Sequence, residues 1–161
     1  MARMKLLVVL GEGGHTAELL NLIDLLGNRY DYHYIISQED NLSAARIRHP
    51  GHIYRLPRPR GKNTGALSSF LITLSCSIKA FGILQRLRPK AILSTGPAIV
   101  VPAALVGKLF KTKIIFIETG SRIMTLSMTG RIMYHIADLF FVQWPQLAKK
   151  LPRAIFAGRL I

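Results

Sequence analysis

Six residues near the start of the chain combine glycines with a histidine, and they are the first place where chemistry is expected. Residues 11–16 read Gly-Glu-Gly-Gly-His-Thr, between a short apolar run and leucines at helical spacing. This order indicates a strand that turns into a helix. Glycines let backbone N–H groups approach a ligand, and a helix N-terminus favours anions. The pattern therefore predicts a phosphate-binding turn formed by Gly13, Gly14, His15 and Thr16.

The same turn differs from the common nucleotide-binding loops. Thr16 stands where the dinucleotide fingerprint has its third glycine, and the Gly-Lys-Ser/Thr ending of a P-loop is missing. An alternative without a ligand also stays open, because a glycine turn can simply begin a helix with His15 or Thr16 as its polar cap.

Three residues could perform acid–base chemistry or bind phosphate. A neutral His15 could take a proton from a substrate hydroxyl as a general base, and an orienting or capping role is the alternative. Glu118 follows an apolar run at the expected carboxyl end of a strand, where ligands of open α/β sheets bind. It could bind hydroxyls, act as an alternative base, or pair with Arg122. If it does not pair, Arg122 could hold a phosphate with two hydrogen bonds.

Other kinds of chemistry find little support in the residues. No His, Cys and carboxylate residues have metal-ligand spacing, and no Ser-His-Asp pattern is present, so we expect a displacement without metal or cofactor. Cys76 is the only cysteine, which excludes an internal disulfide and favours a reducing compartment. The apolar run at residues 6–10 is too short for a signal peptide. These features together predict a cytoplasmic location.

Strand and helix patterns alternate along most of the 161 residues. We expect one Rossmann-like α/β domain over residues 1–161, with a mostly parallel sheet and helices on both faces. Residues 38–49 could form a helix or a loop, and residues 58–65 a basic loop. The expected strands are residues 6–10, 32–37, 52–56, 91–93, 113–117 and 139–142, with a weak one at 154–157. The expected helices follow the glycine turn, cover residues 66–87, end near residue 109, and cover residues 128–136.

Positive charge gathers in one window of the chain, whose formal net charge is +14. Residues 41–117 contain 13 Lys and Arg and no Asp or Glu. Such a window favours an anionic partner. The basic residues flank long uncharged stretches and do not alternate with aromatics, which favours an anionic membrane surface over nucleic acid. A generally basic protein without a specific anionic target is the alternative.

One uncharged stretch inside that window is a candidate for membrane contact. Residues 63–78 lack any charge but include several Ser and Thr, and a spanning helix needs about 20 apolar residues. We therefore expect a helix that lies in the membrane interface, with basic residues at the head groups. The alternative is an ordinary helix whose apolar stripe belongs to the core. The predicted membrane contacts are Arg58, Arg60, Lys62, Phe70, Leu71 and Leu74.

Several segments together resemble one known family. They are Gly-Gly-His-Thr-Ala-Glu-Leu-Leu at residues 13–20, Ser-Thr-Gly-Pro at 94–97, Glu-Thr-Gly-Ser-Arg at 118–122, Leu-Ser-Met-Thr-Gly at 126–130 and Phe-Val-Gln-Trp-Pro at 141–145. In this order they are similar to the asparagine-linked glycosylation protein 14 family, over essentially the whole chain. That family is in turn similar to the N-terminal half of MurG-like transferases of the GT-B fold.

The resemblance implies a specific division of labour. The chain would be the membrane-recruiting subunit of a heteromeric inverting glycosyltransferase, and it would bind a lipid-diphosphate-linked saccharide as acceptor. A partner subunit resembling the C-terminal half of MurG would bind the UDP-sugar donor. Bacterial relatives act in capsule and exopolysaccharide synthesis. The glycine turn together with Gly96 and Arg122 would hold the acceptor diphosphate at the cytoplasmic face of the membrane, in a peripheral or monotopic way.

Two other classes of function remain possible on the residues alone. A self-sufficient nucleotide-dependent Rossmann enzyme would need a fingerprint loop and an acid at the end of the second strand. Ser37 and Gln38 stand there, although Glu39 and Asp40 follow. A non-catalytic basic membrane adaptor would not need the pair Glu118 and Arg122.

Overall fold

The computed structural model describes residues 3–11, 13–57 and 66–160, and of residues 66–70 only the backbone. Three predicted membrane contacts, Arg58, Arg60 and Lys62, therefore lie outside the described residues, and so does the side chain of Phe70.

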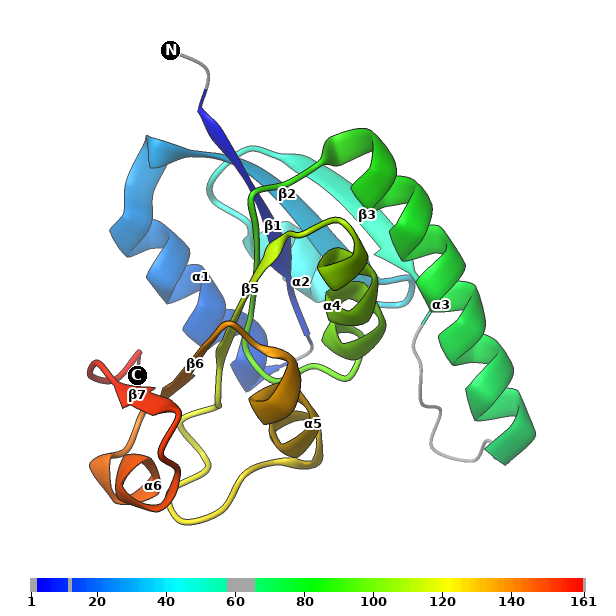
Figure 1. The fold of residues 1–161 in the computed structure, drawn as a ribbon. Helices are drawn as coiled ribbons and strands as arrows, with labels where there is room; N and C mark the ends of the chain where they lie inside the picture. Colours follow the sequence, from blue (N-terminus) through cyan, green and yellow to red (C-terminus); the bar gives the residue numbers. More distant parts are fainter. Residues whose placement is uncertain (1–2, 12, 58–65, 161) are drawn as a thin grey trace.

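Seven parallel strands form one sheet in the order β3-β2-β1-β4-β5-β6-β7 (Figure 1). Each described strand pairs in parallel with its neighbours. The chain order reverses between β1 and β4, which is the position where open α/β sheets bind ligands. The strands are β1 (Met4–Val9), β2 (Tyr30–Ser37), β3 (His52–Leu56), β4 (Ala91–Ser94), β5 (Lys113–Ile117), β6 (Leu139–Val142) and β7 (Ala154–Phe156).

Helices cover both faces of this sheet, as predicted. On one face α1 (Gly14–Leu26) packs through Leu19 and Ile23 against side chains of β1 and β2, with α2 (Asn41–Arg46) beside it. On the other face lie α3 (Ala66–Leu87), α4 (Val100–Leu109) and α5 (Met128–Ile136). Figure 1 shows α1 on one side of the strands and these three helices on the other. Alternate residues of the strands feed the two cores, because side chains of a strand point to opposite faces.

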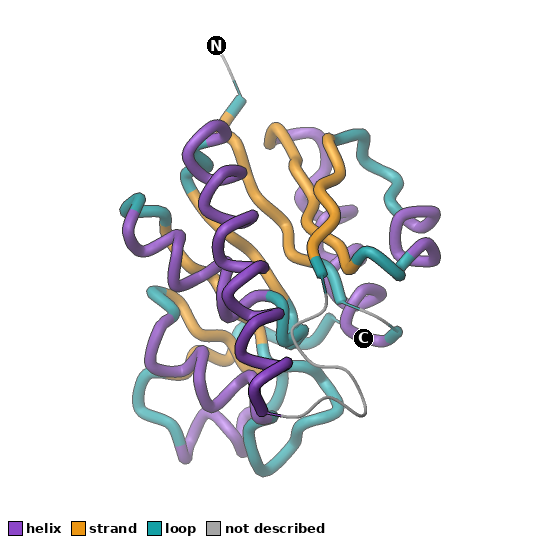
Figure 2. The backbone as a smooth tube through the Cα atoms, turned by 90° about the vertical axis from the view of Figure 1, so that its right-hand side faces the viewer, coloured by secondary structure: helices purple, strands orange, loops and turns teal. Residues whose placement is uncertain are grey.

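The long helix α3 has one buried and one exposed apolar face. The buried face packs against the sheet and consists of Cys76, Ala80, Leu84 and Leu87. As the connection from β3 to β4, α3 runs antiparallel to the strands, so it begins at the edge where the strands end. Figure 2 shows its full length along one side of the molecule.

Most expected elements occur where the sequence places them. The boundaries of β3, α3, β5, α5 and β6 are those predicted, and the open segment after β2 contains the short helix α2. Two short helices were not predicted: the 3-10 helix η1 (Gly27–Arg29) and α6 (Pro145–Lys150), which has only six residues and soon follows the strand β6. Fewer than two turns are too short to show an apolar periodicity.

Candidate functional site

The loops that carry the predicted functional residues meet at one edge of the sheet. Because all strands are parallel, their carboxyl ends lie together, and Val9 is in register with both Ile35 and Ser94. The glycine turn after β1 therefore lies beside residues 95–97 after β4. Residues 119–122, here called the β5 turn, follow β5 at the same edge and close with a hydrogen bond from Arg122 N to Thr119 O of 3.0 Å.

The glycine turn presents backbone donors and little else. Gly13 is the N-cap of α1 with φ of 69°, and no described side chain caps this helix end. The first N–H groups of a helix have no acceptor within the helix, so those after Gly13 are available to a ligand. At Gly14 no described atom outside the chain neighbours and the helix's own backbone lies within 4 Å of the position where a Cβ would be, so this stretch of backbone faces open space.

Thr16 contributes differently from what the sequence suggests. Its side chain is fully buried, its hydroxyl donates to Gly11 O, and it also hydrogen-bonds Ser43 Oγ at 2.9 Å. The hydroxyl therefore ties the turn to α2 and does not face a ligand. Only the backbone N–H of Thr16 remains to bind one.

His15 packs its ring directly against Gly96. A Cβ at Gly96 would lie 2.5 Å from His15 Cε1, and Gly96 has φ of 77°, so both space and backbone require glycine there. Thr95 Oγ1 donates to His15 O at 2.6 Å, which fixes the helix end to the β4 loop. His15 Nδ1 is buried without a hydrogen-bond partner.

The surroundings of His15 favour the neutral form of its ring. Burial lowers the pKa of His15 below its usual value, and the positive charge of Arg122 lowers it further, while the negative charge of Glu18 acts in the opposite direction. A neutral imidazole has one nitrogen free to accept a proton. The residue thus has the protonation state that a general base needs.

Glu118 is buried completely and holds the loop after β5. Its Oε2 accepts hydrogen bonds from Ser127 N and Ser127 Oγ, both at 3.1 Å, and its Oε1 accepts one from Thr119 N at 3.1 Å. A Cβ at Gly130 would overlap Oε2, so glycine at that position lets α5 approach. The carboxylate forms no ion pair with Arg122 and presents no oxygen to solvent. Its geometry is that of a support for the loop, and not that of the directly acting base considered from the sequence.

Burial raises the pKa of Glu118 above its ordinary value, although the hydrogen bonds from Ser127 and Thr119 oppose the effect. Arg122, in contrast, is exposed at the tip of the β5 turn. No described residue forms an ion pair with its guanidinium, so a phosphate can bind there.

A second buried carboxylate, Glu18, was not singled out from the sequence. It lies in α1 one turn after His15 and is only 5% exposed. Its Oε1 accepts from Thr119 Oγ1 at 2.9 Å and from Gly120 N at 3.1 Å, and its Oε2 accepts from Gln143 Nε2 at 3.0 Å. A glutamate inside a helical pattern resembles any solvent-facing helix residue. The only available signal was its place three residues after His15, on the same side of the helix.

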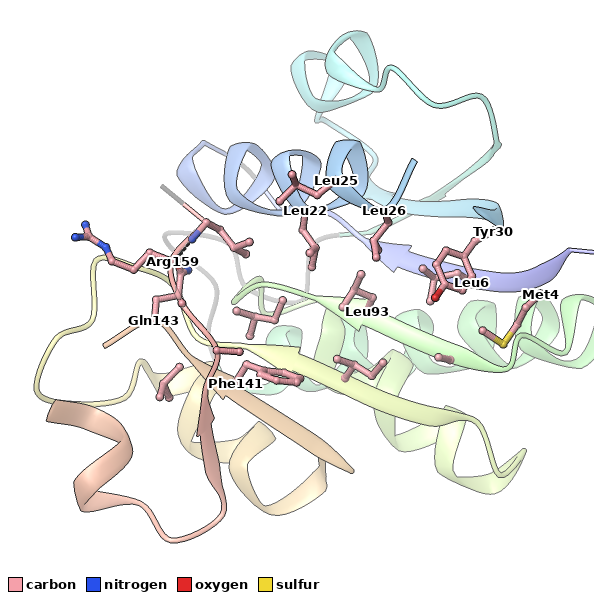
Figure 3. A pocket seen from close by; sticks show the side chains of 17 residues that line it. Met4, Leu6, Leu22, Leu25, Leu26, Tyr30, Leu93, Phe141, Gln143 and Arg159 are labelled. Atoms are coloured by element: carbon pink, nitrogen blue, oxygen red, sulfur yellow. Dashed lines mark hydrogen bonds between the residues drawn. The ribbon is translucent and has the colours of Figure 1, made fainter. Parts of the chain in front are cut away.

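An apolar groove runs between α1 and the sheet, with a volume of about 430 Å³. Figure 3 shows Leu22 and Leu26 of α1 facing Leu93 and Phe141 of the strands across it. Its end beside the carboxyl edge is bordered by Gln143 and by residues 157–160. No described helix covers β5 and β6 on this face, although strands of a parallel sheet are usually covered on both faces.

The outer face of α3 is apolar and exposed. Leu71, Leu74, Ile78 and Phe81 recur at intervals of three or four residues, and between 44% and 65% of each is exposed. The predicted contacts Leu71 and Leu74 therefore do not belong to the core. Leu105 and Leu109 of the neighbouring α4 are exposed too.

None of the helices in the described ranges combines the length and the hydropathy that a bilayer crossing requires. Within the same ranges, no group of three or more His, Cys, Asp or Glu side chains is arranged to hold a metal ion.

Comparison with known proteins identifies the family to which the chain is related. Residues 6–160 match the family described as "Oligosaccharide biosynthesis protein Alg14 like". The chain belongs to this family. It is 36% identical over 180 residues to the human UDP-N-acetylglucosamine transferase subunit ALG14, with 98% of this chain and 83% of the relative covered. The Schizosaccharomyces pombe subunit is 33% identical, with 95% and 81% covered.

Solved structures show the same fold in one half of longer chains. MurG of Acinetobacter baumannii superposes with a TM-score of 0.74 at 13% identity, over 89% of this chain and 42% of that one. UDP-N-acetylglucosamine 2-epimerase of Rickettsia bellii gives 0.74 at 16% identity, over 98% and 45%. The chain thus spans less than half the length of these proteins. The likeness confirms the Rossmann-like fold predicted from the sequence.

Proposed function

We propose that this Alg14-family chain is the acceptor-binding and membrane-recruiting subunit of a heteromeric inverting glycosyltransferase. The reaction transfers a sugar, N-acetylglucosamine by analogy with the relatives' names, from a UDP-sugar to a lipid-diphosphate-linked saccharide. The observation that carries the proposal is the partly buried His15, whose surroundings favour its neutral form, beside a helix end that no described side chain caps, with Arg122, which no described residue pairs, at the same edge.

These groups match an acceptor that combines a diphosphate with a sugar hydroxyl. The backbone N–H groups of Gly13, Gly14 and His15 would bind phosphate oxygens at the positive end of the helix dipole. Arg122 would add a charge-assisted hydrogen bond from the opposite side. Each helix-end contact contributes only about 0.3–1 kcal/mol, so the turn orients the diphosphate and Arg122 supplies much of the attraction.

The chemical step is a displacement at the anomeric carbon of the donor sugar. His15 accepts the proton of the acceptor hydroxyl, the freed oxygen forms the new glycosidic bond, and the bond to the UDP oxygen breaks with its electron pair leaving on UDP. Attack opposite to the leaving group inverts the anomeric configuration. Glu118 serves this scheme by holding the loop that carries Arg122.

The lipid part of the acceptor gives the exposed apolar side chains a role. Ile123 and Met124 follow Arg122 directly, and each is about half exposed, at 43% and 51%. The first turns of α3, with Leu71 and Leu74, lie at the same end of the sheet. A membrane surface at this end would receive these apolar side chains together with Lys79 and the predicted basic contacts Arg58, Arg60 and Lys62. The chain would then work at the cytoplasmic face as a peripheral or monotopic protein.

The donor would come from a partner subunit resembling the C-terminal half of MurG. The chain matches only one half of MurG, and a cleft between two domains needs the other half. The uncovered groove beside α1 offers an apolar surface on which such a partner could bury side chains. We place the partner's contact there.

Reconstitution tests the proposal. The chain is assayed alone and with a candidate donor-binding subunit, using a UDP-sugar and a short-chain lipid-diphosphate-GlcNAc. We expect transfer only when both subunits are present, with inversion of the anomeric configuration. Robust transfer by the chain alone would contradict the division of labour, and unchanged transfer by His15→Ala would contradict the assigned site.

A second candidate is a non-catalytic membrane adaptor, which the exposed apolar face of α3 favours. An adaptor would recruit its partner to membranes without using His15. The complex with His15→Ala separates the two, because an adaptor function would keep full turnover in that variant when membranes are replaced by detergent.

A further inference from the structure

We propose that Glu18 is a positioning residue of the acceptor site, because its buried carboxylate fixes the β5 turn against α1 and so sets Arg122 opposite His15. The inference rests on the proposed function, in which His15 and Arg122 act on the acceptor.

The hydrogen bonds of Glu18 join three separate parts of the chain. Through Thr119 Oγ1 and Gly120 N the carboxylate holds the β5 turn, and through Gln143 Nε2 it holds the residue after β6. Gln143 Nε2 also donates to Glu118 O at 3.2 Å. Glu18 therefore joins the helix that carries His15 to the turn that carries Arg122.

The turn is held from its other sides as well. Glu118 Oε1 accepts from Thr119 N, and Trp144 Nε1 donates to Gly120 O at 2.6 Å. Thr119 and Gly120 are buried, whereas Arg122 at the end of the turn is exposed. A rigid base with an open tip is the arrangement that orients a binding side chain without blocking it.

The partners of Glu18 are all neutral, and no described cation pairs with it. A buried carboxylate without an opposite charge is costly to keep in a fold. Its three partners are all donors, so an amide of the same shape would place an N–H group against one of them, and the carboxylate satisfies all three. The same charge lies one helical turn from His15, whose basicity it supports.

The charged groups acting on His15 oppose each other. Burial is the largest influence and lowers the pKa of His15, Glu18 on its own helix raises it, and Arg122 from the β5 turn lowers it. The β4 loop against the ring contributes only Thr95, Gly96 and Pro97, which carry no charge. Removing Glu18 or Arg122 should therefore move the pKa of His15 in opposite directions.

The experiment uses Glu18→Gln in the complete two-subunit complex, with exposed Glu39→Gln as the control for net charge. Amide hydrogen exchange at Gly120 should become about tenfold faster or more in Glu18→Gln, because its charge-assisted acceptor is weakened. The acid limb of kcat/KM, which reports the base in the free enzyme, should move to lower pH. Arg122→Gln should move it to higher pH, and Glu39→Gln should change neither quantity.

Thr119→Val provides a second variant in case Glu18→Gln does not fold. It removes the hydrogen bond to Glu18, together with the weaker bonds of Thr119 Oγ1 to Ser121, and keeps the charge of Glu18. Exchange at Gly120 should therefore accelerate and the acceptor KM should rise several-fold, while the acid limb stays in place. Unchanged exchange at Gly120 in the variants would overturn the inference. Faster exchange with wild-type kinetics and pH profile would also overturn it, since Glu18 would then be structural only. If His15→Ala keeps full turnover, the proposed function fails separately, and the exchange data still decide whether Glu18 holds the turn.

Discussion

At the carboxyl edge of the sheet, polar side chains are buried and bonded to one another, whereas on the outer surface of α3 apolar side chains face solvent. At the edge, Glu18 and Glu118 have partners for their oxygens, the buried His15 Nδ1 has none, and the exposed groups are the backbone of the glycine turn and Arg122. On α3, no described side chain fully covers Leu74 or Ile78, and both remain exposed. The edge is organised before any ligand arrives. The apolar surface of α3, in contrast, can be covered only by something outside the described part of the chain.

The buried network at the edge therefore concerns the chemical step, whereas the apolar surface of α3 concerns where the protein is located. Changes at the edge should alter turnover or folding in any medium, since the network is internal. Changes on α3 should matter only where a membrane is present. The following experiments test that separation, beginning with the largest expected effect.

The strongest test is His15→Ala in the reconstituted complex. Loss of a general base typically lowers turnover by about 10²–10⁴-fold. The free energy of unfolding should fall by only about 1 kcal/mol, because the ring loses its packing against Gly96 but Nδ1 has no hydrogen bond to lose. Steady-state kinetics and chemical denaturation measure the two quantities. His135→Ala, an exposed histidine on α5, is the matched control and should leave both unchanged.

Gly14→Val tests the backbone side of the same edge. A side chain there meets no described protein atom within 4 Å of its Cβ, so folding should be kept. In the proposed function the acceptor diphosphate approaches this backbone, so we expect kcat/KM for the acceptor to fall by roughly 10²-fold. Gly82→Ala in α3 also points a Cβ into open space and serves as the control. Equal kinetics for both variants would show that the diphosphate does not bind at the glycine turn.

Glu118→Gln tests the buried network through stability. An amide places N–H donors where Ser127 or Thr119 already donates, so we expect a loss of about 1–3 kcal/mol in the free energy of unfolding. The loss should be largest in acid. Burial raises the pKa of Glu118 in the folded state above its pKa in the unfolded state. The wild-type carboxyl therefore contributes most to folding stability below the unfolded-state pKa, and this contribution is lost as pH rises through the folded-state pKa.

Denaturation of both proteins between about pH 4 and pH 7 checks this sign, because the unfolded pKa of a glutamate is about 4.3. The difference between wild type and Glu118→Gln should shrink as pH increases. A difference that grows with pH would mean that the carboxylate is stabilised in its charged form, contrary to the direction given by its burial.

The smallest effect on the protein itself is expected for Leu71→Ser with Leu74→Ser. Both side chains are about half exposed, so unfolding free energy should change by no more than about 0.5 kcal/mol, and turnover in detergent should stay the same. Flotation with anionic liposomes should fall. Changing Arg58, Arg60 and Lys62 to Glu tests the electrostatic share of the binding, which salt should screen.

Leu84→Ala on the buried face of the same helix is the contrasting control. Leu84 is fully buried, and such truncations cost about 2–5 kcal/mol. It should weaken the fold without a specific effect on flotation of the protein that remains folded. If the double variant with Leu71→Ser and Leu74→Ser floats with liposomes like the wild type, or if the wild type does not float, the outer face of α3 does not bind membranes.

The sequence by itself determined the alternating α/β order, most element boundaries and the edge of the sheet at which the candidate site residues lie. Continuous apolar runs followed by glycine or by a polar residue mark buried parallel strands, and this signal is local in the chain. The segments at residues 13–20, 94–97 and 118–122 belong to loops after strands, so parallel pairing was enough to bring them together.

Only the tertiary structure decided what each side chain does at that edge. Thr16 and Glu118 are turned inward to hold loops, while Arg122 is left open, and no spacing in the chain could distinguish these outcomes. Glu18 gains its partners from residues more than 100 positions away. Likewise, the apolar stripe of α3 could have faced the core or solvent, because periodicity reveals an apolar face but not what covers it. Contacts between distant segments, and not local pattern, settle such questions.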